Sequence, residues 1–171
     1  MCRKAASSRN SGRLAMRRNL QLGLLFSMMA LLVAIQLVPS GVSNPASRGE
    51  VSAQPEIQET LRRSCYDCHS NQTRWRWYGH VAPFSWAVAR DVELGRRQLN
   101  FSEWGDYYPV TRKRKLQWMG RALQQEVMPP LSYRLIHPSS RLSPRDRAQL
   151  ERWIDTQLVS AATSSASKAG D

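Results

Sequence analysis

A long stretch without any charged side chain constrains this chain of 171 residues more than any other feature. No Asp, Glu, Lys or Arg occurs between Arg18 and Arg48, and Leu20–Val38 is almost continuously apolar. As a helix, Leu20–Val38 would span about 28 Å, which is close to the hydrocarbon thickness of a bilayer. A buried helix of this length in a soluble domain would carry a polar face, and this segment has none. The sequence therefore predicts one transmembrane helix over residues 20–38.

Charge flanks this segment on its N-terminal side only. Residues 1–19 hold six of the 25 basic side chains and no acidic one. Basic flanks stay in the cytoplasm, so we expect residues 1–19 to be a cytoplasmic leader in a single-pass protein of the inner membrane, with the rest in the periplasm. No small-x-small cleavage site directly follows the apolar run, which favours an uncleaved anchor over a removed signal peptide. Export also excludes nucleic acid as the partner that a net charge of +12 would otherwise suggest.

Beyond the apolar segment the sequence predicts an all-α domain. Residues 39–54 are rich in Ser, Pro and Gly and are expected to form a linker, and the Ser- and Ala-rich residues 160–171 a disordered tail. Between them, residues 55–159 show apolar residues at helical spacing and no strand-like alternation. The expected helices cover 55–63, about 85–99, about 111–126, and a last helix that begins at the capping sequence Ser-Pro-Arg-Asp of residues 143–146.

The motif with the clearest chemistry is Cys65-Tyr66-Asp67-Cys68-His69. Two thiols separated by two residues can form thioethers with the two vinyl groups of a haem, and the adjacent histidine then lies under the iron as its proximal ligand. The motif lies on the exported side of the predicted anchor, where such attachment takes place. We therefore expect one covalently bound haem c, held by Cys65, Cys68 and His69.

Three other interpretations of the cysteine pair compete with haem attachment. A redox-active Cys-x-x-Cys pair usually accompanies a βαβ pattern, which this sequence lacks. A zinc site would need a second cysteine pair or suitably spaced histidines, and neither is present. A structural disulfide is the third alternative, because exported proteins form disulfides.

Met128 is the expected sixth ligand of the iron. It precedes Pro129 and Pro130, which disfavour helix and place the thioether in a loop before the last helix. A methionine ligand also raises the reduction potential of a haem. The alternatives for this position are His137, before Pro138, and His80, beside Gly79.

Two side chains that follow the motif are further candidates for the haem pocket. Trp75 could form part of its wall and donate an indole N–H to a propionate, and Arg74 could pair with a propionate. The competing interpretations are an aromatic core residue for Trp75 and a solvated charge for Arg74.

Many segments of this chain, in order, resemble the bacterial haem-binding domain family of small membrane-anchored proteins with a single c-type haem site. They are Cys65–His69, Ser70–Trp75, Val81–Pro83, Ser85-Trp86, Asp91-Val92, Gly95-Arg96, Leu99–Trp104, Met128–Tyr133 and His137-Pro138. The resemblance covers about residues 44–158 and implies haem attachment at Cys65, Cys68 and His69. It supports Met128 and His137 as functional positions without deciding between them. Arg76, where the family usually has Pro, and His80, where it usually has a small or polar residue, depart from the pattern, which argues against His80 as a common ligand.

A broader resemblance to cytochrome c folds implies how the helices pack. In such folds the helix before the haem motif and the C-terminal helix cross each other and enclose one face of the haem. Here they would meet through Ile57 and Leu61 on the first helix and Leu150 and Ile154 on the last.

The sequence favours an electron carrier over an enzyme. The first hypothesis is a membrane-tethered monohaem cytochrome that passes single electrons to or from a redox partner protein at the outer face of the membrane. The second is a haem-based sensor or ligand-binding module whose sixth iron position is open or labile. A peroxidase-like enzyme has the least support, because the sequence shows no assembled distal motif.

Overall fold

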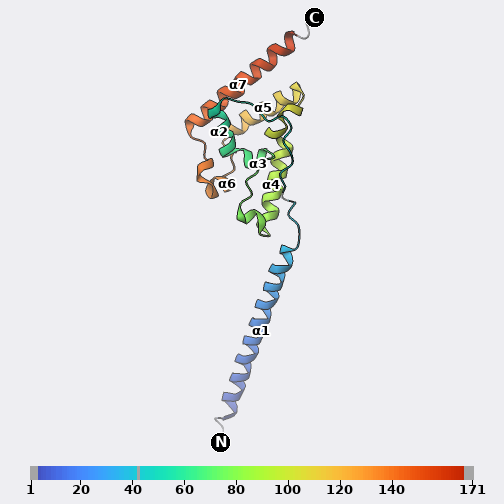
Figure 1. Cartoon of the computed structure of the whole chain (residues 1–171). Coiled ribbons are helices and arrows are strands. Elements are labelled where there is room, and N and C mark those ends of the chain that lie inside the picture. The colour runs from blue at the N-terminus through green and yellow to red at the C-terminus, as the bar shows by residue number, and fades with distance from the viewer. Residues whose placement is uncertain (1–3, 42, 168–171) are drawn as a thin grey trace.

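The computed structural model describes residues 4–41 and 43–167, and this part of the chain is all-helical, as the sequence predicts. Figure 1 shows a compact helical domain from which one long helix projects. The elements are α1 (Lys4–Gln36), α2 (Pro55–Ser64), α3 (Tyr66–His69), η1 (Trp77–His80), α4 (Phe84–Gln98), η2 (Phe101–Asp106), α5 (Pro109–Gln124), α6 (Leu131–Ile136), η3 (Pro138–Ser140) and α7 (Pro144–Ser167), where η denotes a 3₁₀ helix.

The projecting helix α1 contains the apolar segment that the sequence marks as an anchor. An 18-residue stretch of its portion Gly12–Gln36 has a mean hydropathy of 1.7, and none of that stretch is buried. This helix is long and apolar enough to cross a membrane. Residues 1–3 of the expected leader lie outside the described residues.

One apolar core holds the domain together, and it contains the contact expected between the first and last helices. Ile57 and Leu61 of α2 and Leu150 and Ile154 of α7 are buried in the same cluster. The other buried members come from the segment before α2, from the residue that follows α4, and from α3, η2, α5 and α7: Val51, Tyr66, Leu99, Phe101, Trp104, Leu116, Leu123 and Trp153. The helix that precedes the cysteine motif therefore packs directly on the C-terminal helix.

The start of α7 has the capping geometry that the sequence predicts. The Ser143 backbone N–H donates to Asp146 Oδ2 at 2.9 Å, and the Asp146 N–H donates to Ser143 Oγ at 3.1 Å. Arg63, at the end of α2, donates to the same Asp146 carboxylate at 3.0 Å. The helix continues to Ser167, into the segment 160–171 for which the sequence predicts disorder, and residues 168–171 lie outside the described residues.

The segment between α1 and α2, expected to be a linker, packs along the domain. The Arg48 N–H donates to the Ser102 carbonyl at 2.6 Å, and the Val51 N–H donates to the Phe101 carbonyl at 2.9 Å. Val51 is buried in the core. Residues 43–53 therefore belong to the folded domain.

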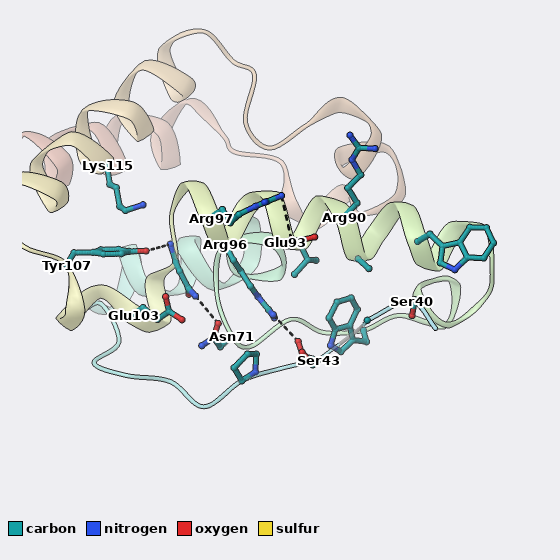
Figure 2. Close-up of a pocket in the computed structure, with 17 residues that line it drawn as sticks. Ser40, Ser43, Asn71, Arg90, Glu93, Arg96, Arg97, Glu103, Tyr107 and Lys115 are labelled. Atoms are coloured by element: carbon teal, nitrogen blue, oxygen red, sulfur yellow. Dashed lines mark hydrogen bonds and ion pairs between the residues drawn. The ribbon is translucent and has the colours of Figure 1, made fainter. Parts of the chain in front are cut away.

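Arg96 of α4 fixes the beginning of this segment. Its guanidinium donates to the Ser43 carbonyl at 3.0 Å and to Asn44 Oδ1 at 2.9 Å, and Figure 2 shows the side chain reaching from α4 towards Ser43. The same group donates to the Ser70 carbonyl at 2.8 Å and to Thr73 Oγ1 at 3.0 Å. One arginine thus connects the segment that follows α1 to the loop that follows the cysteine motif.

Candidate haem-binding site

A cavity of about 460 Å³ lies beside the cysteine motif, within the range of about 300–1,000 Å³ typical of small-molecule and cofactor sites. Cys65, Cys68, His69 and Met128 all line it. Apolar side chains of α4, η2 and α5 and of the residue that directly follows α4 complete much of the wall: Leu94, Leu99, Phe101, Trp118, Met119 and Leu123. The structure therefore brings the two thiols, the adjacent histidine and the expected sixth ligand to one cavity with a largely apolar lining.

The ring of His69 is oriented by hydrogen bonds from one of its two nitrogens. Nδ1 lies 2.9 Å from the Gly95 carbonyl oxygen and 3.1 Å from that of Leu99. Because carbonyl oxygens only accept hydrogen bonds, Nδ1 carries the proton and Nε2 keeps the lone pair that can bind a metal. Burial lowers the pKa of His69, against the opposing effect of these two hydrogen bonds, and so favours the neutral ring.

Gly95 allows α4 to lie directly against the motif. A β-carbon at this position would overlap the Cys68 carbonyl oxygen and would stand 3.0 Å from the Cys68 carbonyl carbon. The close approach brings the Gly95 carbonyl within reach of His69 Nδ1. A glycine inside an otherwise regular helix is the one sequence signal that could have indicated this contact.

The two thiols lack the electrostatic setting of a redox-active pair. No disulfide joins them, and burial, the largest cause, raises the pKa of Cys65 to about 12 and that of Cys68 to about 11. Reactive Cys-x-x-Cys pairs have a lowered thiol pKa instead. Within residues 4–41 and 43–167, no three His, Cys, Asp or Glu side chains form a cluster suited to a metal ion, so the zinc interpretation lacks its ligand set.

The buried Asp67, between the two cysteines, is the centre of a hydrogen-bond network. Its Oδ1 accepts from the backbone N–H and from Nε of Arg74, both at 3.1 Å. Its Oδ2 accepts from the hydroxyl of Tyr133, on α6, at 2.6 Å. The sequence does not indicate the contact between Asp67 and Tyr133, because 66 residues separate them. The network ties α6, which directly follows the loop of Met128, to the motif.

The other predicted site residues lie away from the cavity wall. Arg74 is paired with Asp67, and His80 is exposed. The Nε2 of His137 and the hydroxyl of Tyr78 share a hydrogen bond at 2.6 Å. Trp75 lines a different hollow, of about 630 Å³, between α4 and the segment that follows α1 (Figure 2). Of the candidates for the sixth ligand, only Met128 lines the cavity.

The donors on this cavity fit a covalently held haem. They are two thiols two residues apart, an imidazole whose Nε2 is left to bind, and a thioether, set among apolar walls that suit a porphyrin. The fold and the site together define a small all-helical haem-binding protein with an apolar helix at its N-terminus.

Comparison with known protein families agrees with this class. A family model described as a haem-binding domain matches residues 30–156, so the chain belongs to this haem-binding domain family. The match begins inside α1 and includes residues 43–53, in agreement with the packing of that segment on the domain. No curated protein and no solved structure matches the chain.

Proposed function

We propose that this protein is a membrane-anchored monohaem c-type cytochrome that transfers single electrons in the periplasm. The observation that carries the proposal is the meeting of Cys65, Cys68, His69 and Met128 on one cavity. Cys65 and Cys68 would hold the porphyrin through thioethers, the Nε2 of His69 would bind the iron, and the sulfur of Met128 would take the sixth position. The bound haem supplies a one-electron iron couple.

The surrounding residues hold this ligand set in place. The Gly95 and Leu99 carbonyls fix the tautomer and orientation of His69. Tyr133 and Asp67 join the α6 end of the methionine loop to the motif. Apolar side chains on the cavity wall would exclude water from a bound haem. His69 and the methionine loop would thus both be held by hydrogen bonds. Such a site suits electron transfer, because its residues need to move little when the iron changes its charge.

The proposed location is the inner membrane, with α1 as a retained anchor. The exposed apolar surface of α1 over residues 20–36 and the basic residues that precede this stretch support an orientation with the N-terminus in the cytoplasm and the haem domain in the periplasm. The redox partner would then be a protein at the outer face of this membrane.

Covalent attachment is tested by expressing the full chain together with a c-type haem maturation system. Denatured protein extracted with acid acetone should keep its haem, and the Cys65→Ser/Cys68→Ser variant should lose it. Haem that extracts from the unaltered protein would contradict thioether attachment.

Ligation by Met128 is tested with Met128→Ala and a matched control. Ferric wild-type protein should show the methionine-to-iron charge-transfer band at the red end of its spectrum, and Met128→Ala should lose it. Met119→Leu changes another methionine that lines the cavity and should keep the band. A band that survives Met128→Ala would contradict this ligand, and rapid CO binding to untreated ferrous wild type would favour the sensor hypothesis over electron transfer.

A further inference from the structure

Three large apolar side chains are exposed within residues 77–84, where η1 leads into α4. Trp77, Val81 and Phe84 have exposed fractions of 76%, 40% and 62%. We call these three residues the η1–α4 edge. Single exposed apolar residues are common on soluble domains, but a group of them rimmed by polar residues marks an interaction surface.

The η1–α4 edge lies where α1 meets the domain. The side chain of Gln36, the last residue of α1, donates to the Ala82 carbonyl at 3.1 Å and accepts from the Ala82 N–H at 3.0 Å. The indole N–H of Trp86 donates to the Val38 carbonyl at 3.3 Å. Ala82 stands between Val81 and Phe84 in the sequence, so the edge is held directly beside the end of the apolar helix.

We propose that the η1–α4 edge inserts into the head-group region of the bilayer that α1 crosses, with lipid as its partner. This inference rests on the proposed function of α1 as a membrane anchor. Aromatic side chains are enriched at the membrane interface, where an apolar ring can enter the acyl boundary while polar groups stay in water. Trp77 and Phe84 meet this description, and the exposed Arg76 can contact anionic head groups.

Such a contact fixes how the haem cavity stands relative to the membrane. The edge lies at the start of α4, and Gly95, which touches Cys68, lies near its end. Residues 84 and 95 are about 16 Å apart along a helix axis. Gln36 joins the end of α1 to Ala82 beside the edge, and Trp86 of α4 binds the Val38 carbonyl. These contacts hold the domain in one orientation, so α4 acts as a spacer between lipid and site.

The experiment is photolabelling of the full-length haem protein in phosphatidylcholine vesicles. One probe is a phosphatidylcholine with a diazirine at the head-group end of an acyl chain, and a second probe carries it at the methyl end. Trypsin then releases three informative peptides, which cover residues 19–48, 77–90 and 98–112. The first contains the apolar part of α1, the second contains the η1–α4 edge, and the third is the internal control.

The control peptide contains apolar side chains that are as exposed as those of the edge. Tyr108 and Val110 have exposed fractions of 79% and 65%. They lie at the beginning of α5, a helix that Figure 1 places away from α1. We expect both probes to label peptide 19–48, the shallow probe alone to label peptide 77–90, and neither to label peptide 98–112.

Serine substitutions sharpen this test. In Trp77→Ser/Phe84→Ser, labelling of peptide 77–90 should fall to the level of peptide 98–112, while peptide 19–48 stays labelled and an unchanged haem spectrum verifies the fold. Tyr108→Ser should change none of the labelling. If peptide 77–90 of the unaltered protein is labelled no more than peptide 98–112 while peptide 19–48 is labelled, the edge does not contact lipid although the anchor stands. If peptide 19–48 also escapes both probes, the anchor proposal fails and this inference with it.

Discussion

Gly95 is the single residue on which the position of the candidate ligands depends most directly. Its carbonyl accepts a hydrogen bond from His69, and its missing side chain leaves room for the Cys68 backbone. Gly95→Ala must push α4 away from the motif, at a cost of about 1–3 kcal/mol, as in other overpacked sites. We expect a lower melting temperature and reduced haem loading per protein, measured by thermal denaturation and by the ratio of haem to protein absorbance.

Gly120→Ala is the matched control for this substitution. Gly120 also lies inside a helix, α5, but a β-carbon there would meet only Ile154 Cγ2, at an ordinary 3.9 Å. Alanine has the higher helix propensity, by about 1 kcal/mol, so this variant should be as stable as the parent or more so. Equal effects of the two substitutions would show that the contact between Gly95 and Cys68 does not limit the site.

Tyr133 is a positioning residue whose hydroxyl joins α6 to Asp67 inside the motif. Tyr133→Phe removes a hydrogen bond to a buried carboxylate and should cost about 1.5–3 kcal/mol of stability. It should also loosen the loop of Met128, so we expect faster CO binding to the ferrous protein than in the parent. A purely structural role would lower the melting temperature and leave CO binding unchanged.

Tyr108→Phe removes a hydroxyl from an exposed tyrosine and serves as the control. Both the melting temperature and the rate of CO binding should match the parent. If Tyr133→Phe behaved like this control, the network around Asp67 would not hold the methionine loop.

Residues of the candidate site that stand in a local motif could be recognised in the sequence. Residues that become neighbours only when the chain folds could not. Cys65, Cys68 and His69 form a local motif, and Met128 is marked by the two prolines that follow it. Arg74 looks like any exposed cation, and its partner Asp67 becomes its neighbour only after the loop between them folds back. The contact between Tyr133 and Asp67 spans 66 residues, which no periodicity or spacing rule reaches.

At the scale of elements, the start of α7 also supports the site through α2. Asp146 accepts from Ser143 within the cap and from Arg63 at the end of α2, two residues before Cys65. Burial raises the pKa of Asp146, but the hydrogen bonds from Ser143 and the charge of Arg63 outweigh it and hold that pKa below its usual value. The carboxylate therefore stabilises the fold at neutral pH, and this contribution is lost as the pH falls through the lowered pKa.

Asp146→Asn tests this contribution. At pH 7 it should reduce the free energy of unfolding by about 1 kcal/mol, the usual value of a helix cap. The difference from the parent should shrink as the pH falls through the lowered pKa of Asp146, because the parent carboxylate then loses its charge as well. Urea unfolding at pH 7 and pH 3 measures both values. Asp155→Asn, an exposed site on the same helix, should have little effect at either pH.

The helices themselves were predictable within a few residues, because caps, prolines and apolar periodicity are local. The helix expected over 85–99 forms as Phe84–Gln98, and that expected over 111–126 forms as Pro109–Gln124. The docked segment 43–53 was not predictable in the same way. This segment forms hydrogen bonds with backbone groups of η2 and with the side chain of Arg96. Arg96 lies about 50 residues further along the chain. Its composition of Ser, Pro and Gly indicates only that it forms no helix.

At the scale of the whole molecule, α1, the docked segment and the site form one connected unit. Gln36 binds the loop at Ala82, Arg96 binds the segment that follows α1, and the same Arg96 holds the Ser70 carbonyl directly after the motif. The position of the haem cavity relative to α1 is thus set by hydrogen bonds at both ends of α4. A flexible tether would leave that position undefined.

The folded domain should itself depend on the haem. The cavity turns apolar side chains of α4, η2 and α5 towards a space that the porphyrin would fill. In Cys65→Ser/Cys68→Ser, these side chains would face water, so we expect the domain to lose most of its helical far-UV dichroism and its cooperative thermal transition. The helical signal of α1 should persist in detergent and sets the baseline.

Unaltered protein made without haem maturation is the control, because it lacks haem but keeps both cysteines. Its spectrum and its thermal transition should match those of the double variant. A double variant whose spectrum and transition match those of the haem-loaded protein would show instead that the apolar cluster around Leu61 and Leu150 folds the domain by itself.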